Sequence, residues 1–336
     1  MRINILSLFD GMSCGQIALN RVGIKYDNYF ASEIDVHAIK VTQTNYPKTI
    51  QLGDVREIKA EKLPKIDLLI GGSPCQGFSF AGKQLNFDDP RSKLFFEFVR
   101  LLKETKPKYF LLENVLMKKE YEQIITAHLG VEPIFINSAL VSAQNRKRLY
   151  WTNIPNVSEP KDKEMLLQDI IEDGGVLKEK SQSILSTIYK ENAKSMVTRN
   201  KQGLLVVCGV MRGRYIVEGK SQDGKMKVAG LTKQRIEVRY DGKTNALTTV
   251  QKDNNAVYEA DGRPHCGIEG IKFRKLTPLE CERLQTVPDN YTACVSNTQR
   301  YRMLGNGWTV DVIAHIFKGL LDENLYQLEL PNHRSK

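Results

Sequence analysis

Short apolar runs alternate with longer amphipathic segments over the first half of the chain. Four apolar runs are bounded by polar residues or glycine, as buried strands are: 3–9, 29–32, 66–72 and 109–115. Three segments between them carry apolar residues three and four positions apart, as amphipathic helices do: 15–22, 36–46 and 93–104. The alternation predicts a doubly wound α/β fold, in which helices cover both faces of a parallel sheet.

The pattern changes after residue 153. The charged segment 162–174 has helical spacing, and the residues after it are rich in Gly, Lys and Arg with only short β-type runs. Helical spacing returns at 276–287 and 308–321, and we expect these segments to pack on the first domain. The predicted organisation is one domain, a smaller loop-rich domain and two connecting segments: 1–155 with 273–330, then 182–268, then 156–181 and 269–272.

Composition and charge limit which partner and which cellular location we expect for this chain. The 336 residues carry 49 Lys and Arg against 39 Asp and Glu, a formal charge of +10, which favours an anionic partner such as nucleic acid. No apolar window approaches the roughly 18 residues of a membrane span, and the N-terminus lacks a signal peptide. We therefore expect a cytoplasmic protein with reduced cysteines. No two of the six cysteines have C-x-x-C spacing, so we expect no metal.

A candidate nucleotide site follows the first predicted strand. The stretch SLFDGMSCG, Ser7–Gly15, ends this strand and opens a helix, where glycines and free N–H groups suit a ligand. Glu33 ends the second strand and could bind both ribose hydroxyls, and Asp54 could meet an adenine amino group. Residues 11–16 read GMSCGQ and lack G-x-G-x-x-G, which argues against a nicotinamide dinucleotide. The pattern predicts an adenosine-type pocket.

The loop GGSPCQGFSF, 71–80, raises two readings of its cysteine. Cys75 is either a small buried side chain or a thiol activated by nearby positive charge and N–H groups. Pro74 restricts the loop and removes one backbone donor. Glu113 ends the next predicted strand, and parallel packing would bring its carboxylate to the same rim of the sheet. The loop alone leaves both readings open.

The segment VSAQNRKRLYW, 141–151, concentrates positive charge. A β-like alternation puts Gln144, Arg146 and Arg148 on one face, so two guanidiniums could point at one anionic or electron-rich group. A basic run is more often a solvated surface, but the apolar flanks of this one favour partial burial.

In their order along the chain these landmarks resemble the DNA cytosine-5 methyltransferases of bacteria and phages. The resemblance covers nearly the whole chain and rests on eight elements: FDGMSCG, the acid of ASE, the Asp of GDV, SPCQ, ENV, QNRKR, RKLTPLECERLQ (274–285) and GNGWTV (305–310). The first motifs are also similar to those of vertebrate de novo DNA methyltransferases. The resemblance implies a Rossmann-like methyltransferase domain with a target-recognition domain at 182–268.

The resemblance also implies a reaction. A methyl group would pass from S-adenosyl-L-methionine, leaving S-adenosyl-L-homocysteine, to C5 of a cytosine flipped out of double-stranded DNA. Cys75 would attack C6 of the ring, while Glu113 would bond N3 and the exocyclic amine. Arg148 and Arg146 match the family's arginines that hold the base carbonyl and the nearby backbone.

Other residues take roles through the same motifs. The implied cofactor-binding residues are Phe9, Asp10, Gly11, Met12, Ser13, Glu33, Ile34, Asp54, Val55, Pro74, Leu94, Asn306 and Trp308. The implied DNA-binding residues are Ser79, Lys83, Gln144, Gln234, Arg235 and Arg239, the last three as candidate contacts in the recognition domain. Two pairs depart from the common family pattern and bear on cofactor affinity: Ser13-Cys14, where Gly-Gly is frequent, and Gly307-Trp308, where Ser-Val is commoner.

Several alternatives remain beside this reading. One branch of the same family methylates cytosine in tRNA, so a tRNA methyltransferase is the second hypothesis. A nicotinamide oxidoreductase and a non-catalytic DNA-binding relative are weaker, because the glycine pattern is missing and both Cys75 and Glu113 are present. We further expect a monomer without membrane association, with a cognate restriction endonuclease as a possible functional companion.

Overall fold

The computed structural model describes most of the first 191 residues, parts of the following region and the segment 272–321. The described ranges are 3–73, 93–173, 175–176, 178–191, 205–208, 210–217, 220–221, 232–237 and 272–321.

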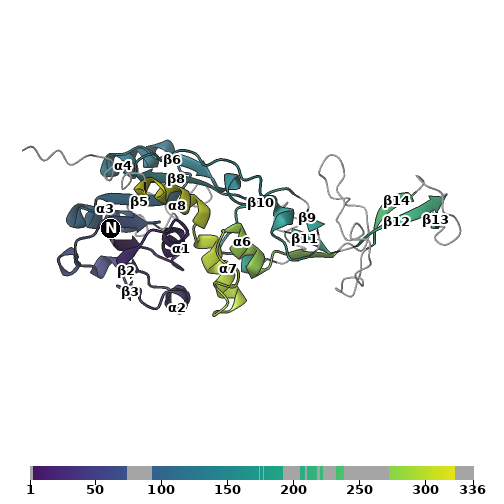
Figure 1. The fold of residues 1–336 in the computed structure, drawn as a ribbon, viewed down its shortest axis with the longest axis horizontal. Helices are drawn as coiled ribbons and strands as arrows, with labels where there is room; N and C mark the ends of the chain where they lie inside the picture. The colour runs from purple at the N-terminus through teal and green to yellow at the C-terminus, as the bar shows by residue number, and fades with distance from the viewer. Residues whose placement is uncertain are drawn as a thin grey trace, which may run out of the picture.

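The largest sheet of the described chain has seven strands, in the order β3-β2-β1-β4-β5-β8-β6 (Figure 1). Its strands are β1 Ile3–Leu8, β2 Tyr26–Ser32, β3 Ile50–Gln51, β4 Leu68–Gly71, β5 Tyr109–Val115, β6 Ile134–Asn137 and β8 Lys147–Thr152. The first five are parallel, and β8 runs antiparallel to both β5 and β6. The mostly parallel sheet predicted from the sequence is confirmed. Because the carboxyl ends of parallel strands share one edge, the loops after β1, β2, β4 and β5 converge there.

Consecutive strand residues contribute to two different hydrophobic clusters, one on each face of the sheet. Ile5 of β1 belongs to the cluster that includes α1 Cys14–Arg21 and α2 Val36–Asn45. Leu6 belongs to the other cluster, with α3 Lys93–Thr105 and α4 Lys119–Leu129. This period of two explains why the strands read as continuous apolar runs, since both of their faces are buried.

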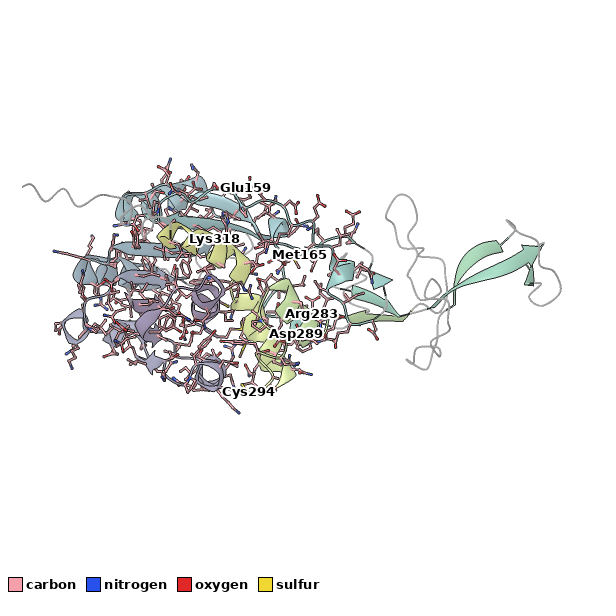
Figure 2. The ribbon with its side chains drawn as sticks, in the orientation of Figure 1. Glu159, Met165, Arg283, Asp289, Cys294 and Lys318 are labelled. Atoms are coloured by element: carbon pink, nitrogen blue, oxygen red, sulfur yellow. The ribbon has the colours of Figure 1, made fainter. Side chains whose placement is uncertain are left out.

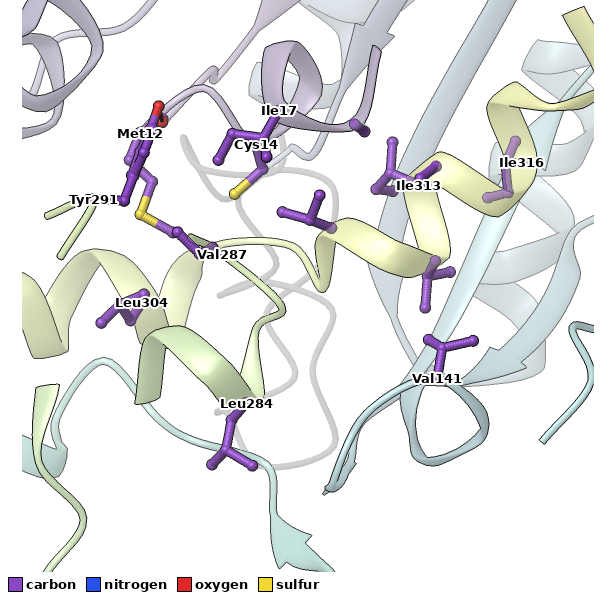
Figure 3. Packing of buried hydrophobic residues seen from close by; sticks show 14 of the residues in the cluster. Met12, Cys14, Ile17, Val141, Leu284, Val287, Tyr291, Leu304, Ile313 and Ile316 are labelled. Carbon is purple, nitrogen blue, oxygen red and sulfur yellow. Dashed lines mark hydrogen bonds between the residues drawn. The ribbon is translucent and has the colours of Figure 1, made fainter. Parts of the chain in front are cut away.

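The last described helices complete the first of these clusters. They are α6 Pro278–Leu284, α7 Asn297–Asn306 and α8 Val310–Phe317. Helix α6 begins at a capping box in which Thr277 and Glu280 satisfy each other's backbone N–H groups, and Arg283 at its end pairs with Asp289 at 2.7 Å (Figure 2). Helix α8 contacts α1, and Ile313 of α8 belongs to the same hydrophobic cluster as Cys14 and Ile17 of α1 (Figure 3). Segments from both halves of the described chain therefore share one core.

The helix predicted at 162–174 is wrong. Only a single 3-10 turn, η4 Leu167–Asp169, forms there. Glu164 has a φ of 56°, a left-handed conformation that interrupts a right-handed helix. The backbone N–H of Lys163 donates to Leu140, and that of Leu167 donates to Glu179. Because these backbone donors bond to residues outside the stretch, they are not available for a helix. The stretch is an irregular connection that contains apolar residues.

Shorter elements complete the described part of the chain. Strand β7 Gln144–Asn145 pairs with β10 Ser181–Gln182. Two small antiparallel sheets follow, one of β9 Gly175–Val176, β11 Leu205–Cys208 and β15 Lys272–Lys275, the other of β12 Val210–Val217, β13 Lys220–Ser221 and β14 Thr232–Glu237. The 3-10 turns are η1 Val55–Glu57, η2 Ala60–Lys62, η3 Ser138–Leu140 and η5 Ile188–Lys190. Among the described residues, every helix is too short or too polar to cross a membrane.

Candidate active site

The loop between β1 and α1 adopts an unusual backbone. Phe9, Gly11 and Ser13 have φ values of 56°, 59° and 64°, in the left-handed region that side chains disfavour. Such conformations concentrate at ligand sites, where the surrounding structure holds them in place. A Cβ built on Gly11 would have no atom within 4 Å, so the loop faces open space there.

Asp10 lies inside this loop and accepts hydrogen bonds from three hydroxyl groups. Ser7 and Tyr29 donate to Oδ1 at 2.6 and 2.7 Å, and Ser13 donates to Oδ2 at 2.6 Å. Burial raises the pKa of Asp10 to about 6, against the opposing effect of these hydroxyls. The loop thus contains a carboxyl group that titrates close to neutral pH.

Glu33, at the end of β2, closes the loop from the neighbouring strand. Its Oε2 accepts the Gly11 N–H at 2.8 Å, and its Oε1 accepts the N–H groups of Ile34 and Asp35, each at 2.8 Å. Ile34 presents an apolar side chain that is 71% exposed beside this carboxylate. The carboxylate suits the ribose hydroxyls of an adenosine, and the exposed apolar side chain suits its adenine ring.

Asp54 and Val55, after β3, are placed differently from this pair. Asp54 is bonded to the guanidinium and the backbone N–H of Arg56, and the Arg56 side chain holds the pKa of Asp54 down to about 2. Val55 is 4% exposed and packs in the cluster with α3. Asp54 is therefore an ionised surface carboxylate, whereas Val55 is a core residue whose contact with a cofactor stays a prediction.

The connection between α6 and α7 also contacts this loop. The Tyr291 hydroxyl donates to the Met12 carbonyl at 2.8 Å, across 279 positions of sequence, and the two side chains lie side by side (Figure 3). Asn306 ends α7 and is exposed, while Leu94 of α3 is half-buried against the cluster that includes Phe98. Sequence reasoning missed Tyr291, because its local pattern carries no signal for a partner so far away.

Three side chains meet where β4 and β5 end. Nε of Arg148, on β8, lies 2.8 Å from Oε1 of Glu113, and the indole N–H of Trp308 donates to Oε2 at 3.1 Å. Gly72 is packed against both, since a Cβ there would lie 2.8 Å from Nε1 of Trp308 and 3.1 Å from Oε2 of Glu113. The structure thus brings the predicted acid and one predicted arginine together.

The start of the loop that carries Cys75 is fixed to the same strand end. The Asn114 amide donates to the Ser73 hydroxyl at 3.1 Å, and both residues are buried. The carbonyl oxygen of the same amide accepts the Val115 N–H at 2.8 Å. Asn114, of the ENV motif, therefore anchors the backbone two positions before Cys75.

The structure does not bring Arg146 to Glu113, which corrects its predicted role as a base-binding arginine. Arg146 is 4% exposed. Its guanidinium donates to the Ser183 hydroxyl and to the carbonyls of Ile184, Gly305 and Gly307, at 3.0 to 3.3 Å. Arg146 and Arg148 are separated because the chain leaves β7 at Arg146 and enters β8 only at Lys147, which breaks the predicted alternation.

Gln144, predicted to bind DNA, lies in the protein interior as well. It is fully buried, and its carbonyl oxygen accepts the Ile184 N–H at 2.9 Å. Its amide nitrogen lies 3.3 Å from the Leu284 carbonyl. In this structure the side chain joins three protein segments and leaves no atom for DNA.

The other predicted site residues cannot be placed in the same detail. Gln234 and Arg235 lie on β14, where they pair with Gly213 and Arg212 of β12. Five predicted residues lie outside the described ranges: Pro74, Cys75, Ser79, Lys83 and Arg239. Within the described ranges, no three His, Cys, Asp or Glu side chains are grouped so that they could hold a metal ion.

Comparisons with solved structures show the fold. A methyltransferase of Entamoeba histolytica, EhMeth, superposes with a TM-score of 0.65 at 17% identity, over 96% of this chain and 99% of that one. A putative DNA modification methyltransferase encoded within an Escherichia coli prophage gives 0.56 at 23% identity, over 95% and 99%. The helices and strands of this chain are therefore arranged as in these two methyltransferases, with a Rossmann-like fold.

Sequence comparisons extend over the whole chain. The Type II methyltransferase M.HpaII of Haemophilus parainfluenzae is 30% identical, over 97% of this chain and 91% of its own length. The orphan methyltransferase M.SPRI of Bacillus phage SPR is 28% identical, over 95% and 98%. The profile of one family, described as C-5 cytosine-specific DNA methylase, matches residues 3–322. The chain therefore belongs to this family and is a methyltransferase that acts on cytosine C5 in DNA.

Proposed function

We propose that this protein is a sequence-specific methyltransferase that uses S-adenosyl-L-methionine and forms a covalent adduct between Cys75 and C6 of a flipped-out cytosine. One observation carries the proposal: the Glu113 carboxylate lies beside Arg148 and Gly72, three positions before Cys75. An acid and a cation thus stand together where the nucleophile's loop begins.

The loop after β1 fits the proposed cofactor by shape and by charge. Glu33 is placed for the ribose hydroxyls, the exposed Ile34 for one face of the adenine, and the open space at Gly11 for the approach of a ligand to the backbone. The carboxylates of Glu33 and Asp10 favour a cationic ligand and disfavour a pyrophosphate. When bound, S-adenosyl-L-methionine supplies the methyl group. Asp54 remains a proposed contact.

The residues of this chain would activate the base. The Cys75 thiolate adds to C6, and the electron pair of the C5–C6 bond makes C5 nucleophilic. Glu113 accepts the exocyclic amine N–H and shares a proton with N3, which relieves the negative charge that arises on the ring, and the proton returns to Glu113 when the thiolate leaves. Arg148 binds the carbonyl of the base. After methylation, loss of the C5 proton returns the electron pair to the ring, and the thiolate leaves from C6 with 5-methylcytosine restored.

The substrate is proposed to be double-stranded DNA read by residues 182–268. The formal charge of +10 favours a polyanion. Gln234 and Arg235 stay candidates for base contacts, and Ser79 and Lys83 for contacts near the flipped nucleotide. Among the relatives M.HpaII is a Type II methyltransferase and M.SPRI is an orphan, so a companion restriction endonuclease is part of the proposal, as is a monomeric state.

Covalent capture tests the mechanism. Incubated with S-adenosyl-L-methionine and duplex DNA that contains 5-fluorocytosine, the wild-type protein should form an adduct that survives denaturing electrophoresis, because fluorine at C5 blocks elimination. Cys75→Ser should form no adduct and transfer no labelled methyl group, yet still retard DNA in a gel. Methyl transfer by Cys75→Ser would refute the assignment of the nucleophile.

A matched variant and a second substrate complete the test. Glu113→Gln keeps the size of the side chain but removes its charge, and we expect a rate lower by about 100-fold. A rate within about threefold of wild type would contradict the role of the acid. Duplex DNA and tRNA are offered in parallel, and labelling of tRNA alone would favour the tRNA reading.

A further inference from the structure

We infer that Trp308 is a positioning residue for Glu113, which its indole N–H holds in the orientation that meets the cytosine. The inference rests on the proposed function, in which Glu113 bonds the base. It differs from the role that the sequence gave Trp308, a contact to the cofactor.

The geometry places the indole on one oxygen and the guanidinium on the other. Nε1 of Trp308 donates to Oε2 of Glu113 at 3.1 Å, and Nε of Arg148 lies 2.8 Å from Oε1. The side chains of Glu113 and Arg148 are only 12% and 15% exposed, so little water competes for these contacts. One hydrogen bond, from Trp308, and one ion pair, with Arg148, therefore hold the carboxylate from two distant segments.

The backbone just after β4 packs closely against this contact. A Cβ on Gly72 would lie 2.8 Å from Nε1 of Trp308, closer than real Cβ contacts allow. Any side chain at Gly72 would push the indole away from Glu113. The glycine before Ser73 thus leaves the space in which the two groups meet.

Hydrogen-bonding capacity favours a contact that persists during the reaction. A carboxylate has about four acceptor sites. Arg148 is proposed to turn to the base carbonyl when the cytosine enters, which leaves Oε1 open to the base. Trp308 occupies only one site on Oε2, so Glu113 can accept the exocyclic amine and share a proton with N3 while the indole stays in place.

The turn that carries Trp308 also touches the loop after β1. A Cβ on Gly307 would lie 2.9 Å from the Met12 methyl group and 3.5 Å from Sγ of Cys14. The position of Trp308, and through it that of Glu113, is therefore set by the same loop that is proposed to bind the cofactor.

Removal of the indole N–H separates the two roles of Trp308. In Trp308→Phe we expect kcat for DNA methylation to fall about 10- to 100-fold, because one hydrogen bond to a charged group is lost. The dissociation constant of S-adenosyl-L-methionine, measured by calorimetry, should stay within about threefold of wild type. Trp151→Phe is the control, since its indole N–H donates to Thr126 at 3.0 Å on the other face of the sheet. This control should leave kcat unchanged.

A double-mutant cycle tests whether Trp308 acts through Glu113. Trp308→Phe combined with Glu113→Gln should be no slower than Glu113→Gln alone, because the positioned carboxylate is already gone. The inference would be overturned if the two substitutions lowered kcat independently, so that their effects multiplied. It would also be overturned if Trp308→Phe weakened the binding of S-adenosyl-L-methionine while kcat stayed normal. Wild-type protein that neither methylates DNA nor forms the adduct would instead refute the proposed function, so the two failures are distinguishable.

Discussion

Replacement of Arg146 by Met tests whether this arginine holds the protein together or touches the substrate. The change removes a buried guanidinium that bonds the Ser183 hydroxyl and three carbonyls, those of Ile184, Gly305 and Gly307. Met has a similar length and no donor. The loss should therefore appear in the free energy of unfolding.

The magnitude follows from the acceptors that lose their donor. The Gly307 carbonyl keeps a second donor, the Gln285 amide at 3.2 Å. The carbonyls of Ile184 and Gly305 lose the guanidinium, and each buried acceptor left without its partner costs about 1–3 kcal/mol. We therefore expect Arg146→Met to lower the free energy of unfolding by about 2–6 kcal/mol. A domain is stable by about 5–15 kcal/mol in total, so the variant should fold, but marginally.

Urea unfolding followed by circular dichroism measures this loss, with methylation kinetics measured below the transition. Lys119→Met is the control, because Lys119 pairs with Glu122 on the surface at 70% exposure, where an ion pair contributes little to stability. Arg146→Lys should recover part of the stability through a single donor. Stability within about 1 kcal/mol of wild type together with a large drop in kcat would refute the interior role and restore the role predicted from the sequence.

Two further predictions concern the loop after β1. The pKa of Asp10 is raised from 3.8 to about 6, so the stability that its protonated form contributes is complete below pH 3.8 and is lost as the pH rises through about 6. In urea unfolding, Asp10→Asn should therefore gain stability relative to wild type between pH 5 and pH 8, and an equal difference at both pH values would contradict the raised pKa. Tyr291→Phe loses the hydrogen bond to the Met12 carbonyl, which is worth about 1 kcal/mol. Its affinity for S-adenosyl-L-methionine should fall about fivefold with kcat at saturation unchanged, and unaltered binding in calorimetry would show that this bond does not position the loop.

Local patterns were sufficient for the parallel strands β1, β2, β4 and β5. The strands at 3–8 and 109–115 match their predicted apolar runs, because strands covered on both faces are mostly apolar. The same logic failed at 162–174, where the apolar residues do not form a helix and Glu164 has a left-handed backbone. Spacing alone does not distinguish a helix from an irregular connection packed on a core.

Side-chain roles were predictable only where a strand end fixes them. Glu33 and Glu113 each end a predicted strand, so their place at the carboxyl edge followed from the fold. The different placements of Gln144, Arg146 and Arg148 could not be predicted from the fold. One residue outside the strands, Arg146, separates β7 from β8 and interrupts the alternation. Burial then turned two of these three polar residues to internal contacts.

The contacts across the longest sequence distances join the two halves of the proposed site. Trp308 reaches Glu113 across 195 positions, and the Tyr291 hydroxyl reaches the Met12 carbonyl across 279. Arg146 binds Gly305 and Gly307 on either side of Asn306, in the turn that leads to Trp308. The loop proposed for the cofactor and the acid proposed for the base therefore depend on one C-terminal turn. Because segment 276–317 supplies these contacts, it is a structural part of the proposed active site rather than a cover over it.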